Sequence, residues 1–157
     1  MANVKPVPDG YPQVIPYLIV DGAADAIDFY NQVFGTKERM RMGGGGKVFH
    51  AELDLGDSMI MLADESPDSP SKSPKGLGGS PVTISLYLPD VDVVWDKAMA
   101  AGAKELRPPT DQFYGDRTAQ FEDPWGHRWN IGTHVEDVSP EEMKKRADAM
   151  MSAAAAK

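Results

Sequence analysis

The feature that most constrains the fold of this chain is an internal repeat. Gly35-Thr36-Lys37-Glu38 ends one amphipathic segment, and Gly102-Ala103-Lys104-Glu105 ends a second one, with a spacing of 67 residues from Gly35 to Gly102. The strands before these segments align Ile15 with Thr83, and the last strands align Met61 with Asn130, at offsets of 68 and 69 residues. A nearly constant offset across strand, helix and final strand indicates duplication. The alternative is that any two β-α-β stretches look alike, but the order and lengths of the elements also agree.

Each copy is predicted to contain a strand, a helix and three further strands. In the first copy these are residues 13–20, 23–34, 38–42, 48–55 and 59–63. Asp21 and Gly22 offer a cap for the helix, and Gly35 is a C-terminal cap. The alternation in 48–55 places Phe49, Ala51, Leu53 and Leu55 on one face and His50, Glu52 and Asp54 on the other.

The second copy repeats this order after a segment without periodicity. Its elements are residues 82–88, 90–101, 104–107, 117–122 and 127–133, the third ending at Pro108-Pro109. Ser139, Pro140 and Glu142 then form a helix start. We therefore predict an α+β fold in a single domain, residues 1–157, with two tandem βαβββ modules whose curved mixed sheets form a cup, plus a C-terminal helix. The boundaries are module 1 at 13–64, a linker at 65–80, module 2 at 81–134 and the helix at 139–155.

Composition excludes several classes of partner. The formal net charge is −8 and the pI is about 4.8, whereas binding to nucleic acid or to an anionic membrane surface needs a basic face. No apolar run is long enough to cross a bilayer, and residues 1–12 lack the apolar core of a secretory signal. The chain has no cysteine. We expect a cytoplasmic protein without disulfides or thiolate chemistry.

Two motifs carry a resemblance to a known family. Ala26-Ile27-Asp28-Phe29-Tyr30 with Val33-Phe34-Gly35, and Phe121-Glu122-Asp123-Pro124-Trp125-Gly126-His127, resemble the vicinal oxygen chelate superfamily. That superfamily includes glyoxalase I, ring-cleaving dioxygenases and the fosfomycin and bleomycin resistance proteins. The resemblance covers residues 13 to 134. The chain is also similar to a bacterial glyoxalase-like subgroup whose activity is mostly unassigned. This similarity lies in His50-Ala51-Glu52-Leu53, residues 111–117 and residues 133–138.

The resemblance also locates where a metal would bind. Metal-using members place His, Glu or Gln ligands on the first and last strand of each module. Those positions fall close to Ile15, Met61, Thr83 and Asn130, and a shift in register brings Gln13 or Pro16 nearer. These side chains do not form a set for a hard divalent ion. We expect no metal and no cofactor, unless the protein is a metal-dependent member.

Strand alternation predicts which residues line the cup. Val14, Leu18, Ile60, Leu62, Ile84, Leu86, Trp129 and Ile131 are expected beneath the helices. The other face supplies the candidate ligand-binding residues Gln13, Tyr17, His50, Met61, Thr83, Ser85, Tyr87, Gln120 and Asn130. This amphipathic set suits a small organic molecule. The alternative is that these polar side chains are merely solvated.

His50 and Glu52 lie two residues apart on one strand and are candidate catalytic residues, as an acid-base pair. The alternative is a surface pair. In residues 113–117, Tyr114 and Arg117 are candidate ligand-binding residues of a lid; alternatively, Phe113 and Tyr114 pack on the sheet edge and Arg117 pairs with Asp116. His134 is expected at the cup rim or at the C-terminal helix.

These observations favour a protein that binds a small organic molecule. The alternative is a metal-dependent glyoxalase-like lyase or isomerase, or a dioxygenase, acting on a vicinally oxygenated substrate. A third and lesser hypothesis is an interaction or regulatory domain. The family resemblance also implies a homodimer, with Met143, Ala147, Met150 and Met151 of the C-terminal helix covering either the partner or the chain's own sheet.

Overall fold

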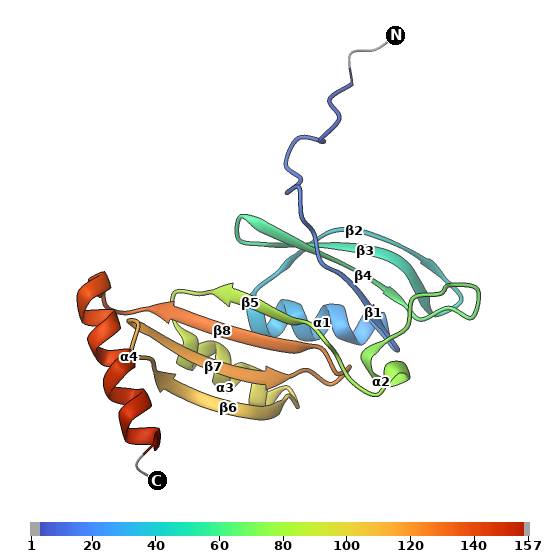
Figure 1. Ribbon diagram of the computed structural model, residues 1–157. Helices are drawn as coiled ribbons and strands as arrows, with labels where there is room; N and C mark the ends of the chain where they lie inside the picture. Colours follow the sequence, from blue (N-terminus) through green and yellow to red (C-terminus); the bar gives the residue numbers. More distant parts are fainter. Residues whose placement is uncertain (1–3, 156–157) are drawn as a thin grey trace. The chain divides into compact units, whose positions relative to one another are not determined.

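The computed structural model describes residues 4–155, which form two compact units (Figure 1). The first unit contains the described residues up to Ser80 together with Pro124–Gly126, and the second contains Pro81–Asp123 and the described residues from His127 onward. Each unit holds a four-stranded mixed sheet. The predicted α+β class and the two βαβββ modules are confirmed, while the cup stays a prediction.

The first unit has the strand order β1-β4-β3-β2. Its elements are β1 (Tyr17–Val20), α1 (Ala23–Phe34), β2 (Lys37–Gly44), β3 (Lys47–Leu55), β4 (Ser58–Asp64) and α2 (Pro74–Leu77). β1 pairs with β4 in parallel, and the other two pairings are antiparallel. α2 lies inside the segment that the sequence marked as an aperiodic linker.

The second unit repeats this order as β5-β8-β7-β6. Its elements are β5 (Thr83–Tyr87), α3 (Val91–Ala100), β6 (Lys104–Asp111), β7 (Asp116–Glu122), β8 (Arg128–His134) and α4 (Pro140–Ala155). Tyr17 pairs with Met61 in the first sheet, and Ser85 pairs with Asn130 in the second. These pairs keep the offsets of 68 and 69 residues seen in the sequence.

One face of each sheet packs against a helix. In the first unit, Leu18, Leu53 and Leu62 are buried, as are Ile27 and Tyr30 of α1. In the second unit, Trp129 and Ile131 are fully buried, and Trp95 of α3 contacts Phe121 of β7 edge to face. Burial of such side chains contributes about 1.5–3 kcal/mol each. The alternate side chains of each strand lie on the opposite face of the sheet, away from that helix.

The helix ends follow the predicted signals with one exception. Gly35 ends α1 at φ 70°, and Asp90 caps α3 by accepting from the backbone N–H of Val93 at 3.1 Å. Ser139 accepts from Glu142 N–H at 3.2 Å at the start of α4. Gly22 is the N-cap residue of α1, as predicted, but the predicted contribution of Asp21 is wrong. Asp64 of β4 accepts instead, from Gly22 N–H at 2.9 Å and Ala23 N–H at 3.0 Å.

Two strand boundaries differ from the sequence prediction by four residues. The first strand begins at Tyr17 rather than at residue 13, so Val14 lies outside the sheet and is 85% exposed rather than buried beneath a helix. β6 continues through Pro108-Pro109 to Asp111. It can do so because β6 is an edge strand and the register shifts between Arg107 and Thr110, so the prolines interrupt no regular ladder.

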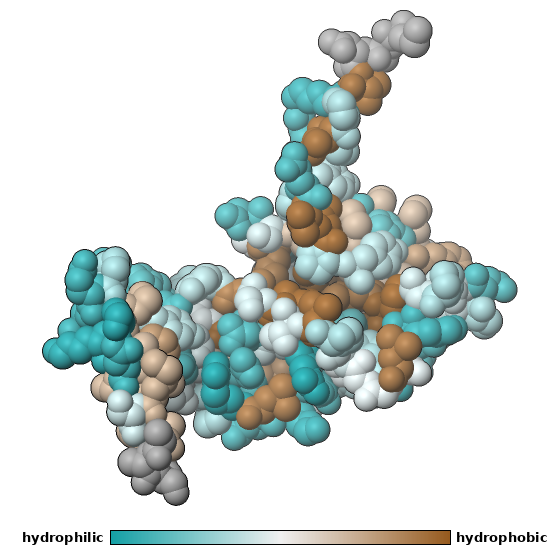
Figure 2. Space-filling view, in the orientation of Figure 1, coloured by the Kyte–Doolittle hydropathy of each residue, from teal (hydrophilic) through white to brown (hydrophobic). Residues whose placement is uncertain are grey.

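The C-terminal helix α4 is amphipathic. Figure 2 shows hydrophilic residues along one side of it and more hydrophobic ones along another. Met143, Met150 and Met151 are exposed within the described residues. Arg146 anchors the helix through Glu136, at 2.7 Å and 2.8 Å, and through the carbonyl oxygen of Phe113 at 3.4 Å. None of the helices among residues 4–155 is long and apolar enough to span a membrane.

Candidate functional site

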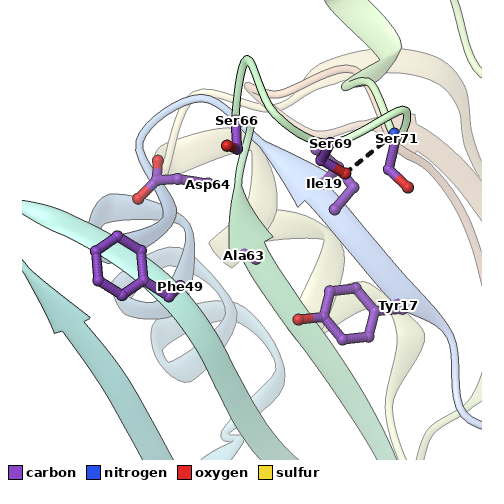
Figure 3. Close-up of a pocket in the computed structure, with 8 residues that line it drawn as sticks. All are labelled: Tyr17, Ile19, Phe49, Ala63, Asp64, Ser66, Ser69 and Ser71. Atoms are coloured by element: carbon purple, nitrogen blue, oxygen red, sulfur yellow. Dashed lines mark hydrogen bonds between the residues drawn. The ribbon is translucent and has the colours of Figure 1, made fainter.

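A pocket of about 520 Å³ lies on the first sheet, on the face opposite α1. Figure 3 shows Phe49 of β3 and Tyr17 of β1 on either side of Ala63 of β4, with serines in the loop that follows β4. The lining residues are Tyr17, Ile19, Phe49, Ala63, Asp64, Ser66, Ser69 and Ser71. This combination of aromatic and aliphatic surface with hydroxyl groups is typical of a pocket for a small organic molecule.

A β-bulge brings Phe49 to this pocket. The pairing of β2 with β3 shifts between Met42 and Gly43, so Val48 pairs with Gly43 and His50 pairs with Met42. Val48 is consequently buried, while Phe49 is 66% exposed. The prediction that Phe49 lies on the same face as Ala51 is therefore wrong, because a bulge reverses the alternation.

The serine hydroxyls can donate to a ligand. Ser66 Oγ accepts from Asp68 N–H at 3.3 Å, and Ser69 Oγ accepts from Ser71 N–H at 3.2 Å. Each oxygen is therefore fixed by its own loop, while the hydroxyl hydrogen rotates and can be donated. The polar side of the pocket suits ligand groups that accept hydrogen bonds, such as carbonyl or ether oxygens.

The Asp64 carboxylate lines the pocket, but it also stabilises the fold through hydrogen bonds to the backbone. Besides Gly22 and Ala23, it accepts from Val48 N–H at 2.7 Å. Burial on its own raises the pKa of Asp64, but these three backbone donors outweigh burial and the net pKa is lowered. Asp64 is therefore ionised at neutral pH, and the pocket disfavours an anionic ligand.

A chain of hydrogen bonds begins at the pocket residue Tyr17. Its hydroxyl lies 2.9 Å from Nδ1 of His50, and Nε2 of His50 lies 3.1 Å from Oε1 of Glu52. Tyr11 donates from its hydroxyl to Oε2 of Glu52 at 2.7 Å, and the guanidinium of Arg39 stacks over the Tyr11 ring at 4.8 Å. The predicted pair of His50 and Glu52 is thus a hydrogen-bonded pair, with Glu52 buried at 4% exposure.

Protonation along this chain follows from its neighbours. The hydrogen bond from Tyr11 lowers the pKa of Glu52, and the bond from His50 adds to this, against the opposing effect of burial. Partial burial raises the pKa of Tyr17. Tyr17 therefore keeps its proton. The Glu52 carboxylate can only accept, so Nε2 of His50 is the donor to it, and in a neutral imidazole Nδ1 then accepts a hydrogen bond from the Tyr17 hydroxyl. The arrangement orients the Tyr17 hydroxyl at the pocket edge and gives it a hydrogen-bond acceptor.

The second unit has a row of polar residues on the sheet face opposite α3. Ser85 pairs with Asn130, Asn130 with Gln120, and Gln120 with Arg107. Gln120 Nε2 donates to Asn130 Oδ1 at 3.2 Å, and Arg107 Nη2 donates to Thr118 Oγ1 at 2.9 Å. Three of these residues were predicted to bind ligand, whereas Arg107 was not.

A second histidine cluster lies at the other end of β7. Asp116 accepts from Tyr87 Oη at 2.6 Å and lies 2.8 Å from Nδ1 of His134, whose Nε2 lies 2.9 Å from Asp137. The Asp137 and Asp116 carboxylates raise the pKa of His134, and the hydrogen bond from Tyr87 lowers the pKa of Asp116. The predicted ligand residue Tyr87 is 74% exposed, but its hydroxyl is bound to Asp116.

The loop that was considered as a lid is tied to the body of the second unit. Gly115 O accepts from Val135 N–H at 2.9 Å and from Glu136 N–H at 3.0 Å. Phe113 and Tyr114 contact each other edge to face and are half-buried. The pair of Arg117 with Asp116, which was the alternative to a lid, does not form: Arg117 binds Asp92 at 2.8 Å and Asp111 at 3.0 Å, because Asp116 is occupied by Tyr87 and His134.

The positions that the family resemblance assigns to metal ligands hold unsuitable side chains. Met61 lies between Tyr17 and Glu52 in the register of the first sheet, and Ile15 lies outside β1. In the second unit, Asn130 Oδ1 is shared by Gln120 and Arg107, and Thr83 is exposed. Within residues 4–155, no three His, Asp or Glu side chains converge as a metal site. The residues present do not fit the family's metal.

The structure thus brings together only part of the predicted set. Tyr17 and His50 meet in the first unit, and Ser85, Gln120 and Asn130 share a row in the second, whereas Gln13 is exposed outside the sheet. The predicted site residues did not include Tyr11, Phe49, the loop serines, Arg107 and Asp116. Only Asp116, at the start of a strand beside Arg117, carried a usable signal.

Comparison with known proteins gives a consistent result. The profile of the Glyoxalase/Bleomycin resistance protein/Dioxygenase superfamily matches residues 12–131. The uncharacterised protein Rv0887c of Mycobacterium tuberculosis is 41% identical over 137 residues, which cover 85% of this chain and 81% of that protein.

Solved structures have the same fold. TioX from Micromonospora sp. ML1 is 26% identical with a TM-score of 0.62, covering 79% of this chain and 99% of that one. The product of the gene At5g48480 of Arabidopsis thaliana is 27% identical with a TM-score of 0.62, covering 77% and 98%. A glyoxalase/bleomycin resistance protein/dioxygenase from Nocardioides, 20% identical with a TM-score of 0.59, covers 88% and 91% and shares the fold alone.

Proposed function

The chain belongs to the Glyoxalase/Bleomycin resistance protein/Dioxygenase superfamily, and from that premise we propose that it binds a small, uncharged amphipathic molecule in the pocket beside Tyr17 and Phe49. The observation that supports this most directly is the composition of the pocket. Its volume of about 520 Å³ lies within the range of ligand pockets, roughly 300–1,000 Å³.

The pocket favours a particular kind of ligand. Tyr17, Ile19 and Phe49 provide apolar surface for an aromatic or aliphatic part, and the hydroxyls of Ser66 and Ser69 provide donors for a carbonyl or ether oxygen. The Asp64 carboxylate disfavours an anion. Binding without metal-dependent turnover is the function that these groups support, because they offer recognition and no site for the family's metal.

The test is a ligand-observed NMR screen of uncharged aromatic alcohols, ethers and amides, followed by titration of the tightest binder. We expect Phe49→Ala to weaken that binder about tenfold, since removing an aromatic contact costs about 1.4 kcal/mol or more. Leu77→Ala is the matched control, because Leu77 is 65% exposed, Phe49 is 66% exposed, and Leu77 does not line the pocket.

The backbone amides of the serine loop provide a second readout. In the wild type, titration should shift the amide signals of Ser66, Ser69 and Ser71 more than those of α4. A ligand that binds Phe49→Ala and the wild type with equal affinity, and that does not shift the serine amide signals, would show that the pocket is not the binding site.

We also propose, from the family resemblance, that the protein is a homodimer. Size-exclusion chromatography with light scattering measures this directly, with a mass twice the 17.1 kDa of one chain as the expected result. A mass of one chain at micromolar concentration would contradict it.

A further inference from the structure

Arg107 is the exception among the arginines of this chain. Five of the six lie within 4.0 Å of a carboxylate. These pairs are Arg39 with Asp54, Arg41 with Glu38, Arg117 with Asp92, Arg128 with Glu122, and Arg146 with Glu136. Arg107 makes no such pair with any residue of the described chain, although the protein has 24 acidic residues. Composition therefore does not explain its isolation.

Its partners are neutral. Nη2 donates to Thr118 Oγ1 at 2.9 Å and to Asn130 Oδ1 at 3.5 Å. Nε is buried and has no acceptor among residues 4–155. A half-buried cation that is held only by a hydroxyl and an amide loses hydration without gaining a counter-charge, which is unfavourable. An anion bound at the guanidinium would remove that cost.

The neighbouring amides are oriented to assist. Asn130 Oδ1 accepts from both Arg107 and Gln120, so this oxygen must face them and its NH₂ group must point elsewhere. Nη1 of Arg107 donates to no group of the described residues. The hydrogen bonds of Arg107 Nη2 and Asn130 Oδ1 therefore orient both side chains. The donors that remain to bind a ligand are Nη1 of Arg107 and Nδ2 of Asn130.

These residues share the sheet face that α3 does not cover. Asn130 and Gln120 alternate with Trp129, Ile131, Ala119 and Phe121, which are buried on the other face. Arg107 extends the row from the edge strand β6, and Ser85 extends it from β5. The row is therefore a partly exposed strip of hydrogen-bonding groups around one positive charge.

We infer that this face of the second unit binds the carboxylate of an organic ligand, with Arg107 and Asn130 as its donors. A planar carboxylate matches the planar guanidinium, and its single charge matches the single cation. The site lies in the second unit, whereas the pocket beside Phe49 lies in the first. The site favours an anionic ligand, which the pocket disfavours. It therefore stands independently of the proposed function.

The test compares benzoate with benzamide, its uncharged analogue of nearly the same shape, by thermal shift at constant ionic strength. In wild type, benzoate should raise the Tm clearly more than benzamide does. Arg107→Met keeps much of the side-chain volume and should reduce the affinity for benzoate at least tenfold. Arg128→Met is the control, because Arg128 lies on the adjacent part of the same sheet and is already paired with Glu122.

A measurement on the wild type covers the case in which Arg107→Met does not fold. Benzoate should shift the Nε–Hε signal of Arg107 and the side-chain amide signal of Asn130, and benzamide should not. Equal responses to the two probes, or a benzoate response that persists in Arg107→Met, would overturn the inference. Phe49→Ala should leave the benzoate response unchanged, so failure here and failure of the pocket are distinguishable.

Discussion

The hydroxyl of Tyr17 and Nδ1 of His50 lie 2.9 Å apart, and the two rings are tilted by 34° with their centroids 5.6 Å apart. Because Tyr17 holds its proton and Glu52 is ionised, this contact fixes which nitrogen of the neutral imidazole is protonated. We predict the Nε2–H tautomer for His50. A long-range ¹H–¹⁵N spectrum of the wild type measures this, and Tyr17→Phe should reduce the preference. Observation of the Nδ1–H tautomer would contradict the hydrogen-bond chain.

Loss of the Tyr11 hydroxyl should destabilise the first unit. Tyr11→Phe removes a 2.7 Å bond to the buried Glu52 carboxylate, and a hydrogen bond to a charged group contributes about 1.5–3 kcal/mol. Chemical denaturation at pH 7 measures the loss. Tyr114→Phe is the control, because the Tyr114 hydroxyl makes no hydrogen bond within the described residues, and its free energy of unfolding should be unchanged.

The same variant has a predicted pH dependence. The pKa of Glu52 is lowered in the folded protein, so its contribution to stability is present above the unfolded pKa, about 4.3, and is lost as the pH falls through the folded pKa. The difference between wild type and Tyr11→Phe should therefore be largest near neutral pH and shrink below about pH 4. A difference that stays constant down to pH 3 would show that Glu52 is not the partner that matters.

Asp64 is predicted to stabilise the start of α1 from a distance of more than forty residues. Asp64→Asn removes the charge and presents an NH₂ group to at least one of the backbone donors Gly22, Ala23 and Val48, which should cost about 1–3 kcal/mol. Asp21→Asn is the matched control, since Asp21 is exposed and its carboxylate pairs, among residues 4–155, only with Lys47 at 3.4 Å, so its effect should be below about 0.5 kcal/mol. Urea denaturation distinguishes the two; equal losses would contradict the capping role.

Local signals explain why much of the fold was predictable. The caps at Gly35, Asp90 and Ser139 are encoded within three residues of the helix ends that they serve. Asp64 could not be identified in that way, because its partners Gly22 and Ala23 are adjacent only after β4 has paired with β1.

The candidate sites were less predictable for a related reason. The position of Phe49 depends on a bulge against a glycine-rich strand, and strict alternation has no means of locating it. Arg107 precedes two prolines, which indicated a strand end, yet the edge position lets β6 continue past them. Both errors are about pairing between strands, and pairing is decided by residues far away in the sequence.

The turn at Gly115 should tolerate no side chain. Gly115 has a φ of 97°, and a Cβ there would collide with the carbonyl oxygen of Glu136. Gly115→Ala should therefore lower stability by more than the roughly 1–3 kcal/mol of left-handed strain alone. Gly45→Ala is the control, because Gly45 also has a positive φ, of 60°, and no atom of the described residues lies within 4 Å of its Cβ position. Thermal unfolding compares them, and equal losses would show that the contact with Glu136 yields easily.

Divalent metal ions are expected not to bind this protein. Elemental analysis should find no stoichiometric metal, and Ni²⁺, Zn²⁺, Mn²⁺ and Fe²⁺ should not raise the Tm. The reason is the chemistry of the donor set: Met61 offers only a thioether, and the Asn130 oxygen is engaged by Gln120 and by the cationic Arg107, which repels a divalent ion. A stoichiometric metal, or a large stabilisation by one of these ions, would favour a metal-dependent lyase, isomerase or dioxygenase instead. In that case Glu52→Gln should abolish the effect if the His50 and Glu52 pair supplies ligands, and an effect that persists in Glu52→Gln would place the ion elsewhere.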